Sequence, residues 1–152
     1  MSVPDNQLHI LVLHGPNMNL VGKRPREIFG NLTLDKINRS LRRTARELEV
    51  QLKIFQSNSE SDLVIKLQRQ RNWADGVLFN PTTLCFTSYT LLDTLQLVGL
   101  PIIEVHLTDT VAGRSTSESL LASACLRQIV GPVKTAYPDA LELLLEHLRV
   151  TE

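Results

Sequence analysis

Short apolar runs alternate with longer amphipathic stretches along this chain. The apolar runs are five to seven residues long, which favours buried strands, and they are predicted at 8–14, 50–55, 76–80, 101–106 and 125–130. Between them, apolar residues recur at helical spacing, as in the helix predicted over 33–49 with Thr33 as its N-cap. Further helices are predicted over 60–73, 87–98 and 138–150.

This alternation of strands and helices predicts an α/β fold with a parallel sheet covered by helices on both faces. Five strands in this length favour the flavodoxin-like order 2-1-3-4-5. No linker or change of composition divides the chain, so we expect a single domain over residues 1–152. Ligands of such sheets bind beyond the carboxyl ends of the strands, so the segments to examine are 14–19, 56–60, 80–83 and 106–114.

Composition and charge exclude several classes of protein. The chain has 152 residues, 43% of them hydrophobic, with 16 basic and 16 acidic residues, so no general basic field exists for nucleic acid. No apolar run has the length of a membrane span, and the first ten residues lack signal-peptide features, so we expect a cytoplasmic protein. Cys85 and Cys125 make no disulfide framework, and no Cys/His spacing is typical of zinc.

Three of these segments have structural as well as functional interpretations. The turn HGPNMN over 14–19 has ordinary turn residues, and it lacks the glycine pattern of dinucleotide or nucleoside-triphosphate sites. The loop over 22–31 is either a lid whose Lys23, Arg24 and Arg26 attract an anion or a solvated basic loop. Cys85 fits a buried small residue better than a nucleophile.

The strand over 101–106 ends in the most informative pair of residues. Glu104 and His106 are two positions apart, so on a strand they share one side. A carboxylate beside an imidazole can orient the ring and fix its tautomer, as a general acid requires. A surface ion pair is the alternative, but packing alone does not explain this pair at the end of a core strand.

Taken together, the chain resembles the type II 3-dehydroquinate dehydratase family. The similarity is carried by Asp93 and the segments 11–34, 56–64, 78–88 and 101–109, and it continues more weakly through 129–131 and Tyr137. The resemblance implies a flavodoxin-like domain, a dodecamer of trimers, and no metal or organic cofactor. It also implies trans elimination of water from 3-dehydroquinate to give 3-dehydroshikimate.

The resemblance assigns roles to residues at the strand ends. Glu104 and His106 match the pair that protonates the departing hydroxyl, Asn17 matches the asparagine of the GPN turn, and Arg24 matches the lid arginine that activates a catalytic tyrosine. The remaining matches are to substrate contacts and to an aspartate at a subunit boundary: Asn80, Leu107, Thr108 and Asp93.

The chain departs from the family pattern at several of these positions. Phe29 occupies the place of the lid tyrosine that removes the proton, and Phe86 the place of a histidine that contacts ring hydroxyls. The arginine-rich segment after IEVH is replaced by 111–121, where Arg114 is the single arginine. A phenylalanine cannot accept a proton, and a polar substrate group facing Phe86 would lose a partner at about 1–3 kcal/mol.

Three hypotheses follow for function. The first is a divergent paralogue that binds a small, less hydroxylated cyclic carboxylate and in which dehydration is weakened or lost. The second is a working dehydratase of the shikimate or quinate pathway, whose base is Tyr89 or a water held by Arg24, although Tyr89 also fits a packing residue at a subunit contact. The third is a structural or regulatory oligomer, against which the Glu104–His106 pair counts.

Overall fold

A five-stranded parallel sheet forms the centre of the protein. The computed structural model describes residues 7–151. The strands lie in the order β2-β1-β3-β4-β7, which confirms the predicted flavodoxin-like order. Their bounds are β1 His9–His14, β2 Gln51–Gln56, β3 Gly76–Asn80, β4 Ile102–His106 and β7 Arg127–Val130.

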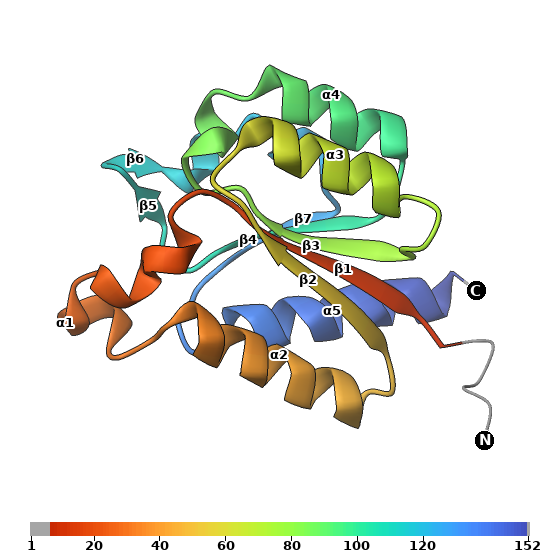
Figure 1. Ribbon diagram of the computed structural model, residues 1–152, viewed down its shortest axis with the longest axis horizontal. Helices are drawn as coiled ribbons and strands as arrows, with labels where there is room; N and C mark the ends of the chain where they lie inside the picture. Colours follow the sequence, from red (N-terminus) through yellow and green to blue (C-terminus); the bar gives the residue numbers. More distant parts are fainter. Residues whose placement is uncertain (1–6, 152) are drawn as a thin grey trace.

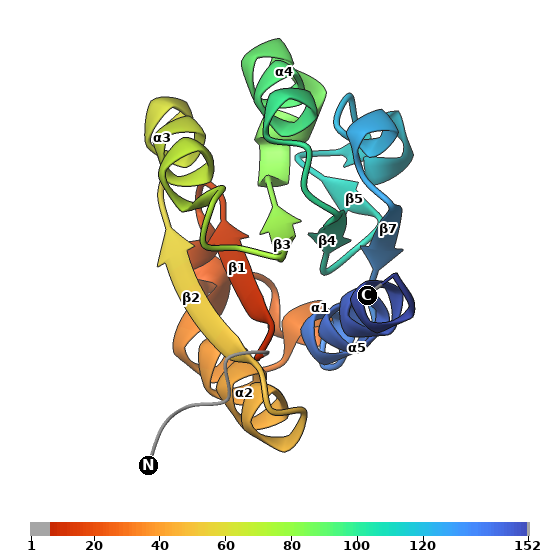
Figure 2. The same cartoon turned by 90° about the vertical axis from the view of Figure 1, so that its right-hand side faces the viewer.

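Helices cover both faces of this sheet, as Figures 1 and 2 show. Helices α2 (Leu34–Glu47) and α5 (Ala136–Val150) pack on one face, and α3 (Glu60–Gln70) and α4 (Tyr89–Val98) on the other. Across residues 7–151, none of the helices combines the length and apolar character that crossing a bilayer requires.

The pattern of side chains in β1 reflects its place inside the sheet, with helices on both of its faces. Ile10 and Val12 belong to the core beneath α2 and α5, whereas Leu11 and Leu13 belong to the core beneath α3 and α4. Successive side chains of a strand point to opposite faces, so a strand covered on both sides reads as one continuous apolar run.

Helix α2 forms where its cap and its apolar stripe predict it. The Thr33 hydroxyl accepts a hydrogen bond from the Lys36 amide, which satisfies one of the free donors at the helix start. Ile37, Leu41 and Ala45 are buried. The helix ends at Glu47, two residues before the predicted boundary.

The structure corrects several sequence-based boundaries. Helix α3 stops at Gln70, three residues before the predicted end, and α4 begins at Tyr89 with Ser88 as its cap. The predicted lid over 22–31 is not structureless, because it contains the end of a 3₁₀ helix over Met18–Lys23 and the short helix α1 over Arg26–Phe29. Short helices of this kind have too few residues to give a periodic signal.

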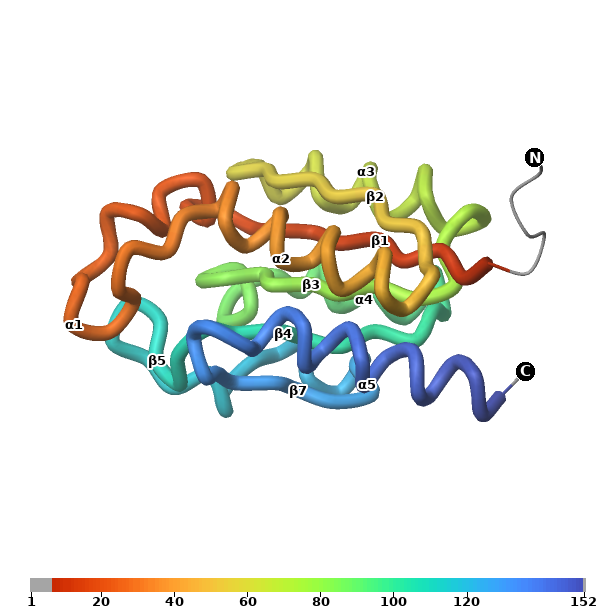
Figure 3. Tube along the Cα trace, turned by 90° about the horizontal axis from the view of Figure 1, so that it is seen from below, coloured from red at the N-terminus to blue at the C-terminus, as the bar shows by residue number. Residues whose placement is uncertain are grey.

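An antiparallel hairpin that the sequence pattern did not predict follows β4. It pairs β5 (Thr110–Val111) with β6 (Arg114–Ser115). Figures 1 and 3 show α1 and this hairpin together at the end of the molecule where the strands finish. Helix α1 and the β5–β6 hairpin therefore lie near each other at the carboxyl edge of the sheet.

Candidate active site

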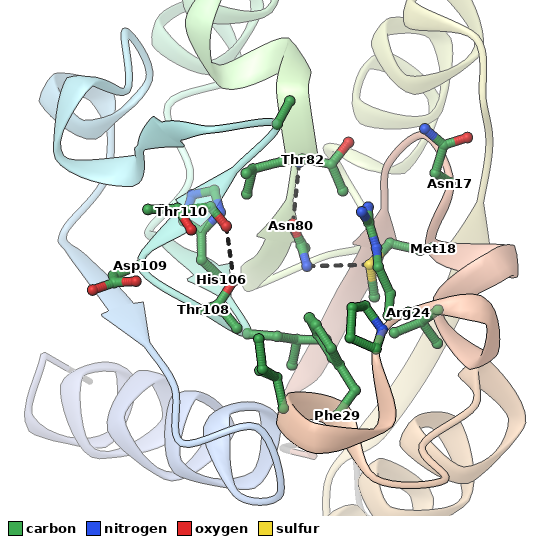
Figure 4. A pocket seen from close by; sticks show the side chains of 16 residues that line it. Asn17, Met18, Arg24, Phe29, Asn80, Thr82, His106, Thr108, Asp109 and Thr110 are labelled. Carbon is green, nitrogen blue, oxygen red and sulfur yellow. Dashed lines mark hydrogen bonds between the residues drawn. The ribbon is translucent and has the colours of Figure 1, made fainter.

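A cavity of about 290 Å³ lies at the carboxyl ends of the strands, between the lid and the β5–β6 hairpin (Figure 4). This is the edge where ligands of open α/β sheets bind. Six of the polar residues in its wall come from four separate segments: Asn17, Arg24, Asn80, Thr82, His106 and Thr108.

Arg24 apart, the lid side of the cavity is apolar. The lid contributes Pro25, Ile28 and Phe29, the residue before the lid contributes Val21, and the hairpin contributes Val111. The Phe29 ring lies where the resemblance leads us to expect a proton-accepting tyrosine. The lid therefore presents mostly hydrocarbon to whatever the cavity holds.

Glu104 and His106 form the buried pair that their spacing on β4 predicts. Glu104 Oε2 lies 2.6 Å from His106 Nε2, and each side chain is 1% exposed. The other two polar atoms of the pair, Glu104 Oε1 and His106 Nδ1, have no hydrogen-bond partner in the protein. His106 lines the cavity, so the carboxylate holds an imidazole that can exchange a proton with a ligand.

Asn80 is fixed by a hydrogen-bond network behind the cavity wall. Its amide nitrogen donates to the Tyr137 hydroxyl at 3.2 Å, and its amide oxygen accepts from the Thr82 backbone at 3.1 Å. The Tyr137 hydroxyl lies 3.0 Å from His14 Nδ1, and His14 Nε2 lies 2.8 Å from Asn38 Oδ1. Because the Asn38 oxygen can only accept, the network places the imidazole proton on Nε2.

His14 and Tyr137 are therefore supports for Asn80 and do not touch the ligand space. Burial raises the pKa of the Tyr137 hydroxyl well above its ordinary value, so it stays protonated and donates to His14. The sequence could not indicate this contact, because 123 positions separate the two residues.

Burial lowers the pKa of His14 from 6.5 to about 4. The folded chain then binds fewer protons than the unfolded chain between these values, so the free energy of unfolding falls as pH drops from 6.5 towards 4. The full shift corresponds to about 3 kcal/mol. We expect His14→Gln to remove most of this pH dependence in urea unfolding curves recorded between pH 4 and pH 7. His147→Gln, on the last helix, should leave the dependence unchanged, and an unaltered slope in His14→Gln would contradict this assignment.

Other residues expected at the site lie in the cavity wall. Asn17 has a left-handed backbone (φ 69°), and its backbone N–H donates to the Asn58 side-chain oxygen at 2.9 Å. Leu107 and Thr108 follow β4 directly, and the Thr108 hydroxyl donates to the Thr110 carbonyl at 2.8 Å. For that hydroxyl to bind a ligand carboxylate, it must turn away from its own chain.

Phe86, Arg114 and Asp93 lie outside the cavity wall of this chain. The Arg114 guanidinium is 4.7 Å from the centre of the Phe86 ring, and its Nε lies 3.3 Å from Glu118. Asp93 is on the exposed side of α4. The contacts that the resemblance assigns to Arg114 and Asp93 stay predictions.

Thr82 is a site residue that sequence reasoning missed. It is buried, it lines the cavity, and its hydroxyl has no hydrogen-bond partner in the protein. Its φ of 52° is unusual for a β-branched residue. Strained residues of this kind gather at functional sites. Thr82 lies within the segment 80–83 selected from the sequence, but nothing in the run Asn-Pro-Thr-Thr distinguishes it from Thr83.

Cys85 packs against the acid pair. Its sulfur, one Glu104 oxygen and one His106 nitrogen lie within 4.8 Å of one another, a grouping of potential metal ligands formed by three buried residues. Burial and the nearby Glu104 raise the pKa of the thiol to about 11. The free thiol is therefore a poor nucleophile, and Cys85 is the buried small residue that the sequence favoured.

Comparison with known proteins assigns this arrangement to one family. The sequence profile described as "Dehydroquinase class II" matches residues 8–145. A 3-dehydroquinate dehydratase from Geotalea daltonii is 38% identical over 144 residues, which cover 93% of this chain and 99% of the relative. One from Desulforudis audaxviator is 43% identical over 140 residues, covering 91% and 93%. The crystal structure of a type II dehydroquinase from Butyrivibrio crossotus matches with a TM-score of 0.85 at 29% identity, covering 91% of this chain and 98% of that one.

Proposed function

The chain belongs to the class II dehydroquinase family, and from that premise we propose that it binds a small cyclic carboxylate while its dehydration of 3-dehydroquinate is weakened or lost. The observation that carries the proposal is Phe29 in the cavity wall, facing the same space as His106. Glu104 and His106, the pair to which the resemblance assigns the acid half of the reaction, are hydrogen-bonded to each other. Phe29, which the resemblance aligns with the family's base, has no atom that can accept a proton.

Neither tyrosine of the chain supplies a substitute base within its own cavity. Tyr89 is 69% exposed on α4 and does not line the cavity. Tyr137 is buried, and its hydroxyl is engaged by Asn80 and His14. Both side chains lie among the described residues, so their placement supports a cavity that lacks the phenolic base.

The wall of the cavity supports a carboxylate with few hydroxyls. Among residues 7–151, Arg24 is the single arginine or lysine that lines the cavity. Asn80 and Thr108 add uncharged polar groups, and Asp109 adds one carboxylate to the wall. The lid side presents Phe29, Ile28 and Val21, where ring hydroxyls would lose their hydrogen bonds to water without replacement. A ring with one acidic group, bound by Arg24, and an otherwise apolar body, packed on Phe29 and Ile28, fits this wall.

A working dehydratase is the second candidate function, favoured by the relatives of 38–43% identity that bear the name 3-dehydroquinate dehydratase. Its base would be a water held by Arg24, the residue that the resemblance matches to the lid arginine of the family. Homo-oligomerisation also stays a prediction; α4 exposes Leu97 and Tyr89.

The rate of 3-dehydroquinate turnover separates these two functions. We expect the purified protein to form the enone product with kcat below about 0.1 s⁻¹, because loss of a general base costs about 10²–10⁴-fold from a typical 10 s⁻¹. The measurement is the growth of enone absorbance under saturating substrate. A kcat near 10 s⁻¹ would favour the second candidate.

Ligand preference tests the binding half of the proposal. We expect cyclohexene carboxylate and benzoate to raise the Tm more than shikimate or 3-dehydroquinate does, because the lid wall is apolar. Arg24→Gln should weaken binding of the preferred acid about tenfold, through loss of a charge-assisted hydrogen bond. Arg39→Gln, which removes an exposed arginine of α2, is the matched control. Equal shifts for all four acids would count against the proposal.

A further inference from the structure

Three potential metal ligands meet beside the cavity, and we propose that they form a divalent transition-metal site for which zinc is the best fit. Cys85, Glu104 and His106 each bring one ligand atom, and these atoms lie within 4.8 Å of one another. Cys85 comes from the 3₁₀ helix Thr82–Phe86 after β3, and the other two from the adjacent strand β4. The inference does not rest on the proposed carboxylate binding.

The donor set selects the class of metal. A thiolate, an imidazole and a carboxylate together suit Zn²⁺, Co²⁺ and related ions, whereas Mg²⁺ and Ca²⁺ prefer oxygen ligands only. Three protein ligands are also the number that zinc sites with an open fourth position use. Tetrahedral bonds to zinc hold such donor atoms about 3.3–3.6 Å apart, a spacing inside the 4.8 Å limit of this cluster.

Two atoms of these residues have no hydrogen-bond partner within the protein. Glu104 Oε1 and His106 Nδ1 are buried and have no hydrogen-bond partner in the protein, although both side chains are 1% exposed. Such atoms are rare in folded proteins because leaving a carboxylate oxygen unpaired in the interior is costly. A metal ion beside the pair would supply the missing positive partner.

The charges of the site balance when an ion binds. The Cys85 thiol gives its proton to water as its sulfur bonds to the metal, so one Zn²⁺ meets one thiolate, one carboxylate and a neutral imidazole. The net charge of this buried group is then zero. Because the ion uses lone pairs of Glu104 and His106, metal binding competes with use of the pair as a proton donor.

The position of the cluster connects it with the cavity. His106 lines the cavity, whereas Cys85 and Glu104 lie behind it. An ion held by the three side chains therefore stands in the wall of the ligand space. Zinc of this kind takes water or a ligand oxygen as its fourth partner.

Cobalt binding gives the direct test. We expect chelator-treated full-length protein to take up Co²⁺ at one ion per chain, with a near-ultraviolet band from thiolate-to-cobalt charge transfer that Zn²⁺ abolishes by displacement. Cys85→Ser should remove the band and weaken zinc binding at least about tenfold, as loss of a metal ligand requires. Cys125→Ser, which changes the other cysteine, is the matched control and should keep both.

X-ray absorption by zinc-loaded wild-type protein completes the test without any variant. The expected zinc shell contains one sulfur and otherwise nitrogen or oxygen. The proposal is overturned by a shell without sulfur, by a cobalt spectrum without the thiolate band, or by a band that survives Cys85→Ser and disappears in Cys125→Ser. These results are independent of enzymatic turnover and of carboxylate binding.

Discussion

Replacing Phe29 by tyrosine is expected to raise the rate of 3-dehydroquinate dehydration by at least about 10²-fold. The substitution adds one hydroxyl to a ring that already lines the cavity, in the same wall as Arg24 and opposite His106 (Figure 4). A guanidinium near a phenol favours its ionised form, which is the form that accepts a proton. In metal-free protein, the hydrogen-bonded Glu104–His106 pair is available to donate the proton that we expect the other half of the elimination to need.

The gain should depend on both the phenol and the acid. Phe29→Leu is the matched control and should show no gain, because it alters the ring without supplying a base. Adding His106→Asn to Phe29→Tyr should return the rate to that of the wild type. Enone absorbance measures all four proteins, and equal rates for Phe29→Tyr and Phe29→Leu would show that the cavity has diverged beyond its base.

The structure changes what we expect from restoring histidine at Phe86. Its ring lies beneath Arg114 and outside the cavity wall, so Phe86→His alone adds no group to the ligand space of this chain. In the double variant with Phe29→Tyr, we therefore expect the tyrosine to carry most of the gain.

Gly15→Ala is expected to lower the free energy of unfolding by about 2–4 kcal/mol. A Cβ at this position would lie 2.7 Å from the Pro81 carbonyl oxygen and 2.8 Å from that of Asn80. Both contacts are with backbone, which cannot swing aside as a side chain does. The Gly15 amide also donates to the Asn80 carbonyl at 2.7 Å, so relief of the clash pulls apart the ends of β1 and β3.

Urea unfolding and ligand titration measure the two consequences of this change. The same movement displaces Asn80 from the cavity wall, so Gly15→Ala should weaken carboxylate binding as well as stability. Gly22→Ala is the control. Its Cβ would meet the methyl end of Thr33 at 3.3 Å and the Leu32 carbonyl oxygen at an ordinary 3.6 Å, so the change should cost less than about 1 kcal/mol. Similar losses in the two variants would refute the close approach at Gly15.

The sequence predicted the sheet well because its strands are buried on both faces. A run such as HILVLH in β1 has the same apolar character whatever lies around it, and helices with an apolar stripe such as Ile37, Leu41 and Ala45 have a clear period. The lid and the β5–β6 hairpin gave no such signal. Their helices and strands are only two to six residues long, which is too short for a hydrophobic period to show in the sequence.

The sequence by itself determined the family through motifs in several segments, and the strand order through the alternation of five strands with helices. It also determined the side of β4 that Glu104 and His106 share, through their spacing of two residues. Only the tertiary structure decided which residues meet. It brought Tyr137 to His14, set Thr82 in the cavity wall, moved Phe86 and Arg114 out of it, and placed Cys85 beside the acid pair. The reason is physical: contacts between separate segments are fixed by how strands and helices pack, and side-chain spacing along one segment carries no information about them.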